Sequence, residues 1–417
     1  QKTAYEISLG LVGSEMCIRD RCIMCAILST LIVIIDSIAS VYVDDIWVYG
    51  NISFIAGTII SFIISLFFCL PLNGRPIGKY IDPNFYMIKL PDKKQLSLYV
   101  LMSIGNAIST VGYFYIISAT MDPSAILPFM QLVVIYLVLG EIIIEGDIPS
   151  LVEIQSLTVI MFGALLASIS PEGTLDLKML GIVMTLINGG GTLRIIAQRK
   201  MRLMRIDGKR IDSINIRLWN LLFSTIFFIM IIAVFDPESI VGVFHVSTEL
   251  LVITIVSMLI TFFARITYIR ALGIGRASIT QAVTSSSVIL AIPFTIIAEK
   301  LVPGTLVELY ASPLVLLIKI IGTIMVALGI ATLALSEVRA YILIKASRGP
   351  WQEILCRISK IRGITRVSAL AGKFDFIAKV KIRTLGKAYR LIVRELEKIR
   401  GIEDFLWLST LYEWEEV

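Results

Sequence analysis

The sequence is poor in charged residues and has almost no histidine. Only 17% of its 417 residues are charged, and the single histidine is His245. Histidine is the usual general base and the commonest metal ligand, so hydrolytic and metal-assisted chemistry are disfavoured. The five cysteines are scattered, and the one Cys-x-x-Cys pair, Cys22 with Cys25, lacks a second pair to complete a zinc site. We therefore predict that the protein is not an enzyme and holds no metal or cofactor.

Long apolar runs dominate the chain instead. Hydrophobic residues make up 57% of it, and the mean hydropathy of +0.86 is too high for a soluble globular protein. A net charge of +6 would suggest nucleic-acid binding in a soluble protein, but here Lys and Arg lie mainly between the apolar runs. This placement is typical of membrane proteins. The expected partner is the lipid bilayer, and nucleic acid is not expected.

Residues 1–21 contain no sustained apolar run, so they predict neither a signal peptide nor a membrane span. They resemble translated sequencing-adapter sequence. We expect this segment not to be native to the protein and the first span to begin near residue 22.

Ten later segments are apolar enough to cross the bilayer, which takes about 20 helical residues. They lie near residues 22–41, 52–71, 97–120, 124–144, 154–170, 178–198, 217–235, 249–271, 277–298 and 313–336. One set of alternate loops is rich in positive charge, with Arg75, Lys79, Lys89, Lys93, Lys94, Arg199, Lys200, Arg202, Arg205, Lys209, Arg210, Arg217, Arg270 and Arg276, whereas the other set holds Lys178 and Lys300. Cytoplasmic loops carry such an excess, so we predict a multi-pass cell-membrane protein with both termini in the cytoplasm.

The apolar region contains an internal repeat with a nearly constant offset. The matches are 115–116 with 268–269, 124–126 with 277–279, and Gly163 with Gly322. Each half has an odd number of spans, so the second half must be inverted relative to the first. The predicted fold is an α-helical polytopic membrane protein of two inverted five-span repeats, residues 22–170 and 171–336.

Short motifs near the ends of the fourth and fifth spans carry a family resemblance. They are Pro128, the Leu-Gly-Glu of residues 139–141 and the Phe-Gly-Ala-Leu-Leu of residues 162–166, with Ala298-Glu299 and Pro293 in a degraded second copy. The region resembles the drug/metabolite transporter superfamily, in particular its ten-span EamA-type members. The resemblance implies alternating-access transport of metabolites, amino acids or drugs.

Asp36 is an acidic residue deep within the first span. A charge at the bilayer centre costs about 2.5 to 3.5 kcal/mol on insertion scales, so it needs a partner or an aqueous cavity. It is either a proton-coupling or substrate-pairing carboxylate, or else a structural partner or an outer-interface residue. Both interpretations are open.

The sixth span contains the run Asn188, Gly189, Gly190, Gly191 and Thr192. Each glycine costs about 1 kcal/mol relative to alanine within a helix, which favours local unwinding or close helix approach. Residues 30–32 match residues 185–187 in the second half, and by the same offset Gly191 corresponds to Asp36. We therefore predict that this run and Asp36 line one polar cavity near the membrane middle. The alternative is packing of small residues between helices.

Further polar residues within the spans are candidates for contacting the substrate: Asn106, Tyr113, Gln131, Arg265, Tyr268 and Gln281. Amides facing inward with one carboxylate would suit a zwitterionic or polar metabolite. The alternative for each is hydrogen bonding between helices. Arg194 and Lys319 lie near span ends, and we expect both to extend to the membrane interface.

From residue 340 the pattern becomes that of a soluble α+β domain. We predict strand 340–346, helix 351–361, strands 365–371 and 376–382, helix 387–399 and strand 403–414. This βαββαβ order is that of a ferredoxin-like unit.

Four segments of this domain, 341–345, 362–364, 372–375 and 400–402, resemble the ligand-binding domain of Lrp/AsnC-type regulators. The resemblance implies pairing into homodimers and binding of an amino-acid effector near Gly372, Lys373, Phe374 and Asp375. No helix-turn-helix precedes residue 340, so DNA binding is not implied. The alternative is a module that only assembles subunits.

The leading functional hypothesis is a transporter of a small polar metabolite, with amino acids among the candidates, and a cytoplasmic domain at 340–417 that senses a ligand or assembles subunits. A membrane-anchored amino-acid sensor without transport activity is the alternative, and a membrane enzyme is the third. The substrate, the direction and the coupling ion do not follow from the sequence.

Overall fold

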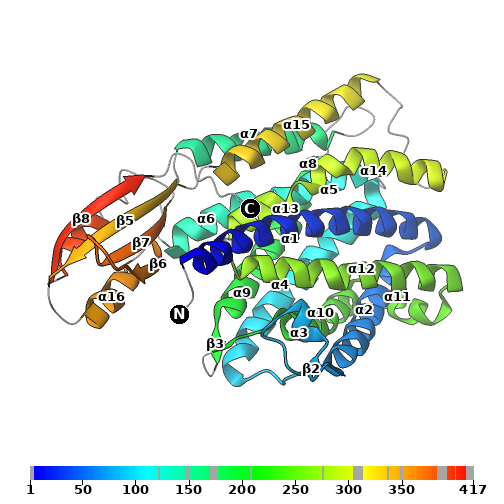
Figure 1. The fold of residues 1–417 in the computed structure, drawn as a ribbon. Helices are drawn as coiled ribbons and strands as arrows, with labels where there is room; N and C mark the ends of the chain where they lie inside the picture. The colour runs from blue at the N-terminus through cyan, green and yellow to red at the C-terminus, as the bar shows by residue number, and fades with distance from the viewer. Residues whose placement is uncertain are drawn as a thin grey trace. The chain divides into compact units, whose positions relative to one another are not determined.

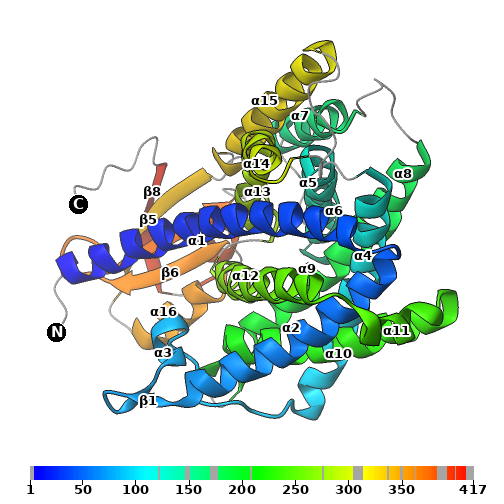
Figure 2. The same cartoon turned by 90° about the vertical axis from the view of Figure 1, so that its right-hand side faces the viewer.

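The structure is a computed structural model that describes residues 4–120, 123–145, 151–169, 177–206, 209–274, 277–303, 313–335, 338–347, 351–361, 363–382, 392–399 and 401–409. The chain divides into two compact units (Figures 1 and 2). The first, the helical unit, comprises residues 1–146 and 157–330. The second comprises residues 147–156 and 331–417 and contains a four-stranded sheet.

Up to residue 335, the described residues form helices and two short hairpins, joined by short connections. The α-helices are α1 (Ala4–Ala39), α2 (Ile46–Cys69), α3 (Gly78–Ile81), α4 (Lys93–Thr120), α5 (Pro123–Gln131), α6 (Val133–Glu145), α7 (Leu151–Ala167), α8 (Leu177–Ile182), α9 (Gly190–Leu203), α10 (Ser213–Phe235), α11 (Glu238–Gly242), α12 (Thr248–Leu272), α13 (Ala277–Thr284), α14 (Ser287–Leu301) and α15 (Pro313–Leu335). The other elements are η1 (Ser40–Tyr42), the π-helix η2 (Val183–Gly189), η3 (Val243–His245) and the hairpins β1 (Pro71–Leu72) with β2 (Arg75–Pro76) and β3 (Arg205–Ile206) with β4 (Lys209–Arg210). We call the side of the helical unit that carries the two hairpins the hairpin end.

Three long helices begin where a side chain caps them. Asp45 accepts a hydrogen bond from the Trp47 N–H at the start of α2. Asp212 and Ser247 do the same for α10 and α12. These caps satisfy N–H groups that a helix start leaves without partners, so each apolar run begins as a helix at a defined residue.

Eight helical segments are long and apolar enough to cross a membrane, among the residues that the structure describes. They are Asp20–Tyr42, Ile46–Cys69, Lys93–Thr120, Lys178–Leu203, Ser213–Phe235, Thr248–Leu272, Ala277–Leu301 and Pro313–Thr332. The predicted spans at 124–144 and 154–170 coincide with shorter apolar helices, Ile126–Gly140 and Leu151–Ala167. The prediction of a helical multi-pass membrane region is therefore confirmed, whereas its finer division into ten spans rests on the two shorter helices.

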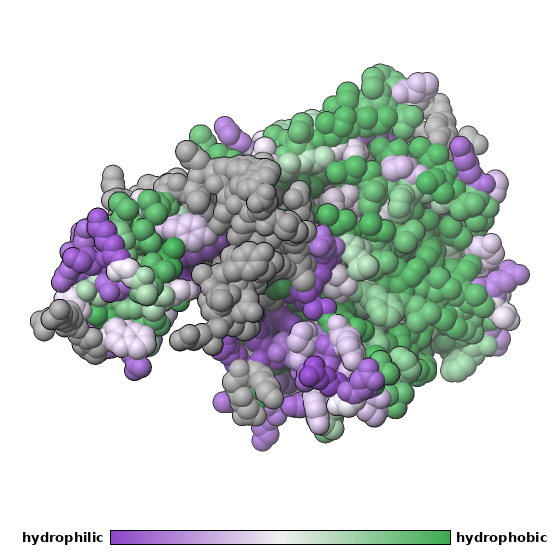
Figure 3. Space-filling model, viewed as in Figure 1, coloured by the Kyte–Doolittle hydropathy of each residue, from purple (hydrophilic) through white to green (hydrophobic). Residues whose placement is uncertain are grey.

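The outer surface of the helical unit is apolar. Exposed side chains such as Phe62 and Ile63 on α2, Met230 on α10 and Val252 on α12 face outward. Figure 3 shows this surface as a continuous hydrophobic area, with hydrophilic residues gathered at the hairpin end. Such a patch far exceeds what a soluble monomer exposes, which is the property expected of a lipid-facing surface.

Close glycine contacts join the helices of this unit. A Cβ atom on Gly190 of α9 would lie 2.7 Å from the carbonyl oxygen of Gly105 on α4, and one on Gly163 of α7 would lie 2.7 Å from that of Gly322 on α15. Because only glycine leaves this space free, the backbones can approach one another. In the same way that α4 packs along α9, α1 packs along α12 (Figures 1 and 2).

Two predicted spans are interrupted rather than continuous. The segment predicted at 124–144 divides into α5 and α6 at Leu132, and the segment predicted at 277–298 divides into α13 and α14 at Ser285 and Ser286. The breaks frame polar side chains that face the interior, as described below.

The sheet of the second unit has strand order β6-β7-β5-β8, with every adjacent pair antiparallel. The elements are β5 (Val338–Ala346), α16 (Trp351–Ser359), β6 (Ile364–Ala369), β7 (Phe376–Ile382), helical residues 392–397 and β8 (Ile402–Ser409). Ile342, Ile344 and Phe376 on the sheet pack with Ile358 and Leu396 to form the core. The predicted small α+β domain is confirmed, while the predicted ends at 387–391 and 410–414 lie outside the described residues.

Candidate functional site

A cavity of about 160 Å³ lies within the helical unit. It is smaller than the roughly 300 to 1,000 Å³ typical of pockets for drug-sized ligands, so it suits a small solute. Its walls come from many helices, chiefly α1, α4, α5, α9, α10, α12 and α13. Apolar side chains such as Phe114 and Met258 alternate there with polar ones.

The structure brings most of the predicted substrate-contacting residues to this cavity. The predicted residues that line the cavity are Asp36, Asn106, Tyr113, Gln131, Gly191, Arg265, Tyr268 and Gln281. Their role as substrate contacts stays a prediction. Asn188, Gly189, Gly190 and Thr192 are not among the lining residues, so the prediction that the whole run lines the cavity holds only for Gly191.

The glycine run serves helix geometry and packing. Residues Val183–Gly189 form a π-helix, and the Asn188 side chain donates to the Phe129 carbonyl oxygen over 3.3 Å. The Thr192 hydroxyl donates to the Asn188 carbonyl oxygen over 2.7 Å. The run stays helical, as the end of the π-helix and the start of α9, so the predicted local unwinding does not occur, whereas the predicted close helix approach does at Gly190.

Asp36 is buried at 3% exposure and bound by three hydroxyl groups. Tyr49 and Ser257 donate to its Oδ1 over 2.6 and 2.7 Å, and Tyr113 donates to its Oδ2 over 2.8 Å. A carboxylate offers about four acceptor positions, so three donors satisfy most of them. Asp36 lies inside the helical unit and links α1 to α2, α4 and α12, as expected of a structural partner.

A hydrogen-bonded chain of side chains spans the two helix breaks. The Tyr268 hydroxyl donates to Gln281 Oε1 over 2.6 Å, and Gln281 Nε2 donates to Gln131 Oε1 over 2.9 Å. Ser285 also donates to Gln131 Oε1, over 2.7 Å. The amides of Gln131 and Gln281 therefore connect helices and also line the cavity. The two interpretations drawn from the sequence, substrate contact and hydrogen bonding between helices, do not exclude each other.

Two arginines that we did not expect also line the cavity. Arg194 is 9% exposed and donates to Asn106 Oδ1 over 3.5 Å, so the expectation that it extends to the interface is wrong. Arg217, counted above among the loop charges, is 4% exposed within α10. From the sequence, a basic residue near the end of an apolar run is interpreted as lying at the membrane interface. Only the packing of the neighbouring helices shows that its side chain points inward. Lys319 is buried as well, and it donates to the Ser124 hydroxyl over 3.1 Å.

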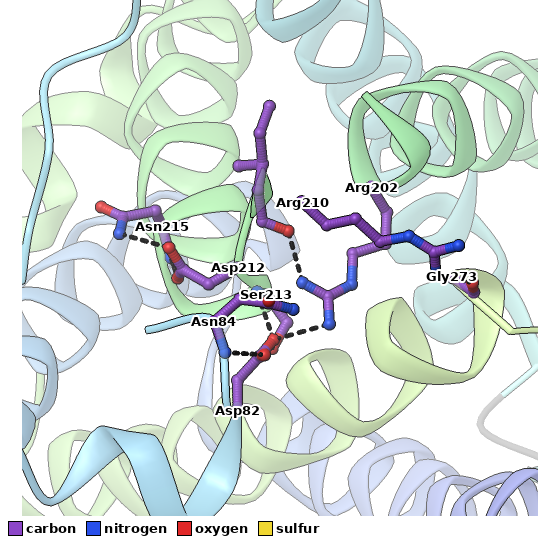
Figure 4. Close-up of polar contacts among 9 residues, drawn as sticks. Asp82, Asn84, Arg202, Arg210, Asp212, Ser213, Asn215 and Gly273 are labelled. Carbon is purple, nitrogen blue, oxygen red and sulfur yellow. Dashed lines mark hydrogen bonds and ion pairs between the residues drawn. The ribbon is translucent and has the colours of Figure 1, made fainter. Parts of the chain in front are cut away.

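A second polar cluster lies at the hairpin end, centred on Asp82 (Figure 4). Its Oδ2 lies 2.9 Å from Arg202 Nη2 and accepts hydrogen bonds from the N–H and hydroxyl of Ser213 over 2.8 and 2.7 Å. Arg202 also donates to the Ile211 carbonyl oxygen. Burial alone would raise the pKa of Asp82, but the Arg202 charge and the Ser213 and Asn84 donors outweigh it and lower that pKa. We call this the Asp82 cluster.

The Asp82 cluster joins three connections of the helical unit. Asp82 follows α3, Arg202 ends α9, and Arg210 in β4 donates to the Gly273 carbonyl oxygen after α12 over 2.9 Å (Figure 4). It is a structural tie at the hairpin end, in which the charges of Asp82 and Arg202 are paired with one another.

In the second unit the predicted effector loop is only partly available to a ligand. Gly372 and Lys373 are exposed, and Phe374 is half-buried. Asp375 Oδ2 accepts a hydrogen bond from the Ala346 N–H over 2.8 Å, so this carboxylate fastens the loop to β5.

Comparison with known proteins identifies the second unit. Residues 339–409 match the family model of the Lrp/AsnC ligand binding domain. This confirms the resemblance drawn from the four sequence segments. A search of curated proteins gives no match to the chain.

Proposed function

We propose that the helical unit is a carrier of the EamA type for a small polar solute, and that the cavity is its solute site. The observation that carries the proposal is a polar cavity inside a unit whose outer surface is apolar. Polar and charged groups are expensive within a bilayer, and where they are kept they mark substrate and ion pathways.

Symmetric packing supports two inverted repeats. Under the repeat offset α1 corresponds to α9 and α12 to α4, and the pairs that pack along each other are α1 with α12 and α9 with α4. The break at Leu132 corresponds to that at Ser285, and Gly163 contacts its own counterpart Gly322. With α5–α6 and α7 as spans, ten spans place both termini on the cytoplasmic side. Cavities at the repeat interface with interrupted helices are the usual solute sites of such carriers.

The carrier function is tested by uptake into proteoliposomes containing the purified full chain, with protein-free liposomes as the control. The panel comprises labelled amino acids of each charge class and small organic acids. Uptake of any solute above the control supports a carrier. If every solute stays at the control level while an amino acid still binds the protein, the protein is the sensor without transport.

We propose further that the Lrp/AsnC domain senses an amino acid or pairs subunits. Leu370, Leu406 and Leu408 are exposed and Ile377 is half-buried; in the sheet register Leu343 lies between Ile377 and Leu406, and Tyr341 beside Leu408. An apolar sheet face of this kind suits pairing with a second copy. Transport and oligomeric state are compared for the full chain and a chain ending at Ser336; identical values would mean that the domain affects neither.

A further inference from the structure

Three guanidinium groups face the same cavity, and the structure provides little to neutralise them. Arg194, Arg217 and Arg265 all line it. Among the described lining residues the one carboxylate is Asp36, which is already bound by three hydroxyls. The Nε atoms of Arg194 and Arg217 are buried without a hydrogen-bond partner among the described residues. Buried charges are normally paired, so this arrangement is incomplete as it stands.

We propose that the cavity binds a small organic anion whose carboxylate groups are held by Arg194, Arg217 and Arg265. This inference rests on the proposed carrier function and names its substrate class. Three positive groups and one negative group leave two positive charges, which a dicarboxylate balances. A neutral or cationic solute would leave the arginines buried without a counter-charge, and an uncompensated buried charge is strongly unfavourable.

The arginines share one side of the cavity. Arg194 lies in the first half of α9, where it donates to Asn106 of α4, Arg217 follows the start of α10, and Arg265 precedes the end of α12. The end of α9, the start of α10 and the end of α12 meet at the hairpin end, where Arg202 contacts Ile211 and Arg210 contacts Gly273 (Figure 4). Asp36 lies toward the other end, since η1, which follows α1 and ends at Tyr42, adjoins the start of α12 at Thr248. An anion therefore meets a cationic wall toward the hairpin end and is kept apart from the Asp36 carboxylate.

The chemistry of arginine sets the class of ligand. A planar guanidinium donates two parallel hydrogen bonds to a carboxylate, and lysine does not reproduce this geometry. The neighbouring Asn106 and Ser109 add neutral polar groups that can donate to further oxygens of the same molecule, whereas the Thr110 hydroxyl already donates to the Asn106 carbonyl oxygen. A short dicarboxylate such as succinate fits the size of the cavity. Its binding there does not require the C-terminal domain to pair with a second copy.

The test measures succinate binding to the purified full chain by its thermal stabilisation, with sodium chloride at equal ionic strength as the salt control. We expect succinate, but not leucine or lysine, to stabilise through the cavity. Loss of a charged hydrogen bond should weaken succinate binding about tenfold or more in Arg217→Met and Arg194→Met, with Arg217→Lys intermediate. Arg75→Gln removes an exposed arginine of β2 and should bind as the wild type does.

If Arg217→Met and Arg194→Met do not melt cooperatively, Arg265→Gln replaces them, because Arg265 is only half-buried. The anion site would be overturned if succinate did not stabilise the protein, or if it stabilised the arginine variants as much as the wild type. Equal stabilisation is also the result expected if succinate bound to the C-terminal domain. Succinate uptake is then measured in proteoliposomes. Arginine-dependent binding without any uptake would leave the anion site standing and sink the carrier function. Uptake of neutral or cationic solutes without succinate binding would support the carrier function and overturn the anion site.

Discussion

The helical unit holds two groups of buried charges that differ in how they are satisfied. In the Asp82 cluster Arg202 faces a carboxylate at 2.9 Å, and Ser213 and Ile211 complete the hydrogen bonds of both groups. In the cavity Arg194 and Arg217 have buried Nε atoms without partners among the described residues. Both groups are built on the same helices, α9 and α10. A paired buried charge stabilises the fold only as part of its pair, whereas an unpaired one persists where a ligand completes it.

The largest expected effect is on the paired side of this comparison. Arg202→Met leaves the Asp82 carboxylate fully buried without its counter-charge, so we expect a loss of about 3 to 5 kcal/mol in the free energy of unfolding. Thermal or denaturant unfolding of the purified protein in detergent measures it, with Arg75→Gln as the exposed control. A loss below about 1 kcal/mol would show that the Asp82 cluster does not hold the loops together.

Asp36→Asn should have the next largest effect. An amide replaces one acceptor oxygen by a donor, so at least one of the hydroxyls of Tyr49, Tyr113 and Ser257 loses its acceptor, at a cost of about 1 to 3 kcal/mol. Ser257→Ala removes a single donor and is the matched, milder change. If Asp36→Asn keeps full stability and full uptake at every pH, then Asp36 neither organises the cavity nor takes part in coupling.

The pH dependence of the free energy of unfolding should reveal the contribution of the paired Asp82 carboxylate. Its pKa is lowered on folding, so its contribution is complete above its ordinary pKa of about 4 and is lost as the pH falls through the lower folded value. Each unit of lowering corresponds to about 1.4 kcal/mol. Burial raises the pKa of nearby Asp212, which acts in the opposite direction. The measured quantity is therefore the difference in melting between the wild type and Asp82→Asn from pH 7 to 3. It should be constant above pH ~5 and shrink below pH ~4; a constant difference throughout would contradict the pairing.

The smallest effect on stability is expected from Arg217→Met in the absence of solute. Methionine removes a buried charge that has no carboxylate partner among the residues that the structure describes, so the free energy of unfolding should change by less than about 1 kcal/mol or rise. Unfolding of this variant beside Arg202→Met makes the comparison directly. If Arg217→Met costs as much as Arg202→Met, the cavity arginines belong to the structural framework.

Local patterns predicted the elements of both units. Long apolar runs predicted the membrane helices, because crossing lipid requires a length and composition that are visible in the sequence. Alternation at 376–382 predicted β7, and the spacing of Ile392, Leu396 and Ile399 along one face predicted the helix that includes residues 392–397, because the core of a small sheet domain imposes these periods. The Lrp/AsnC domain was predicted from the resemblance of four of its segments, and the family model over residues 339–409 confirms it.

Only the tertiary structure decided which polar residues share the cavity. Asp36 and Gly191 were expected there from the repeat, but Asn188 and Thr192 turn to backbone carbonyl oxygens instead. Arg194 and Arg217 read in the sequence as interfacial or loop charges, since a basic residue near the end of a span can extend to water at little cost. The direction in which such a side chain points depends on which helices surround that end of the span. These helices come from segments far apart in the chain. The sequence by itself determined a membrane region and a ligand-binding domain; long-range packing determined where the charges point.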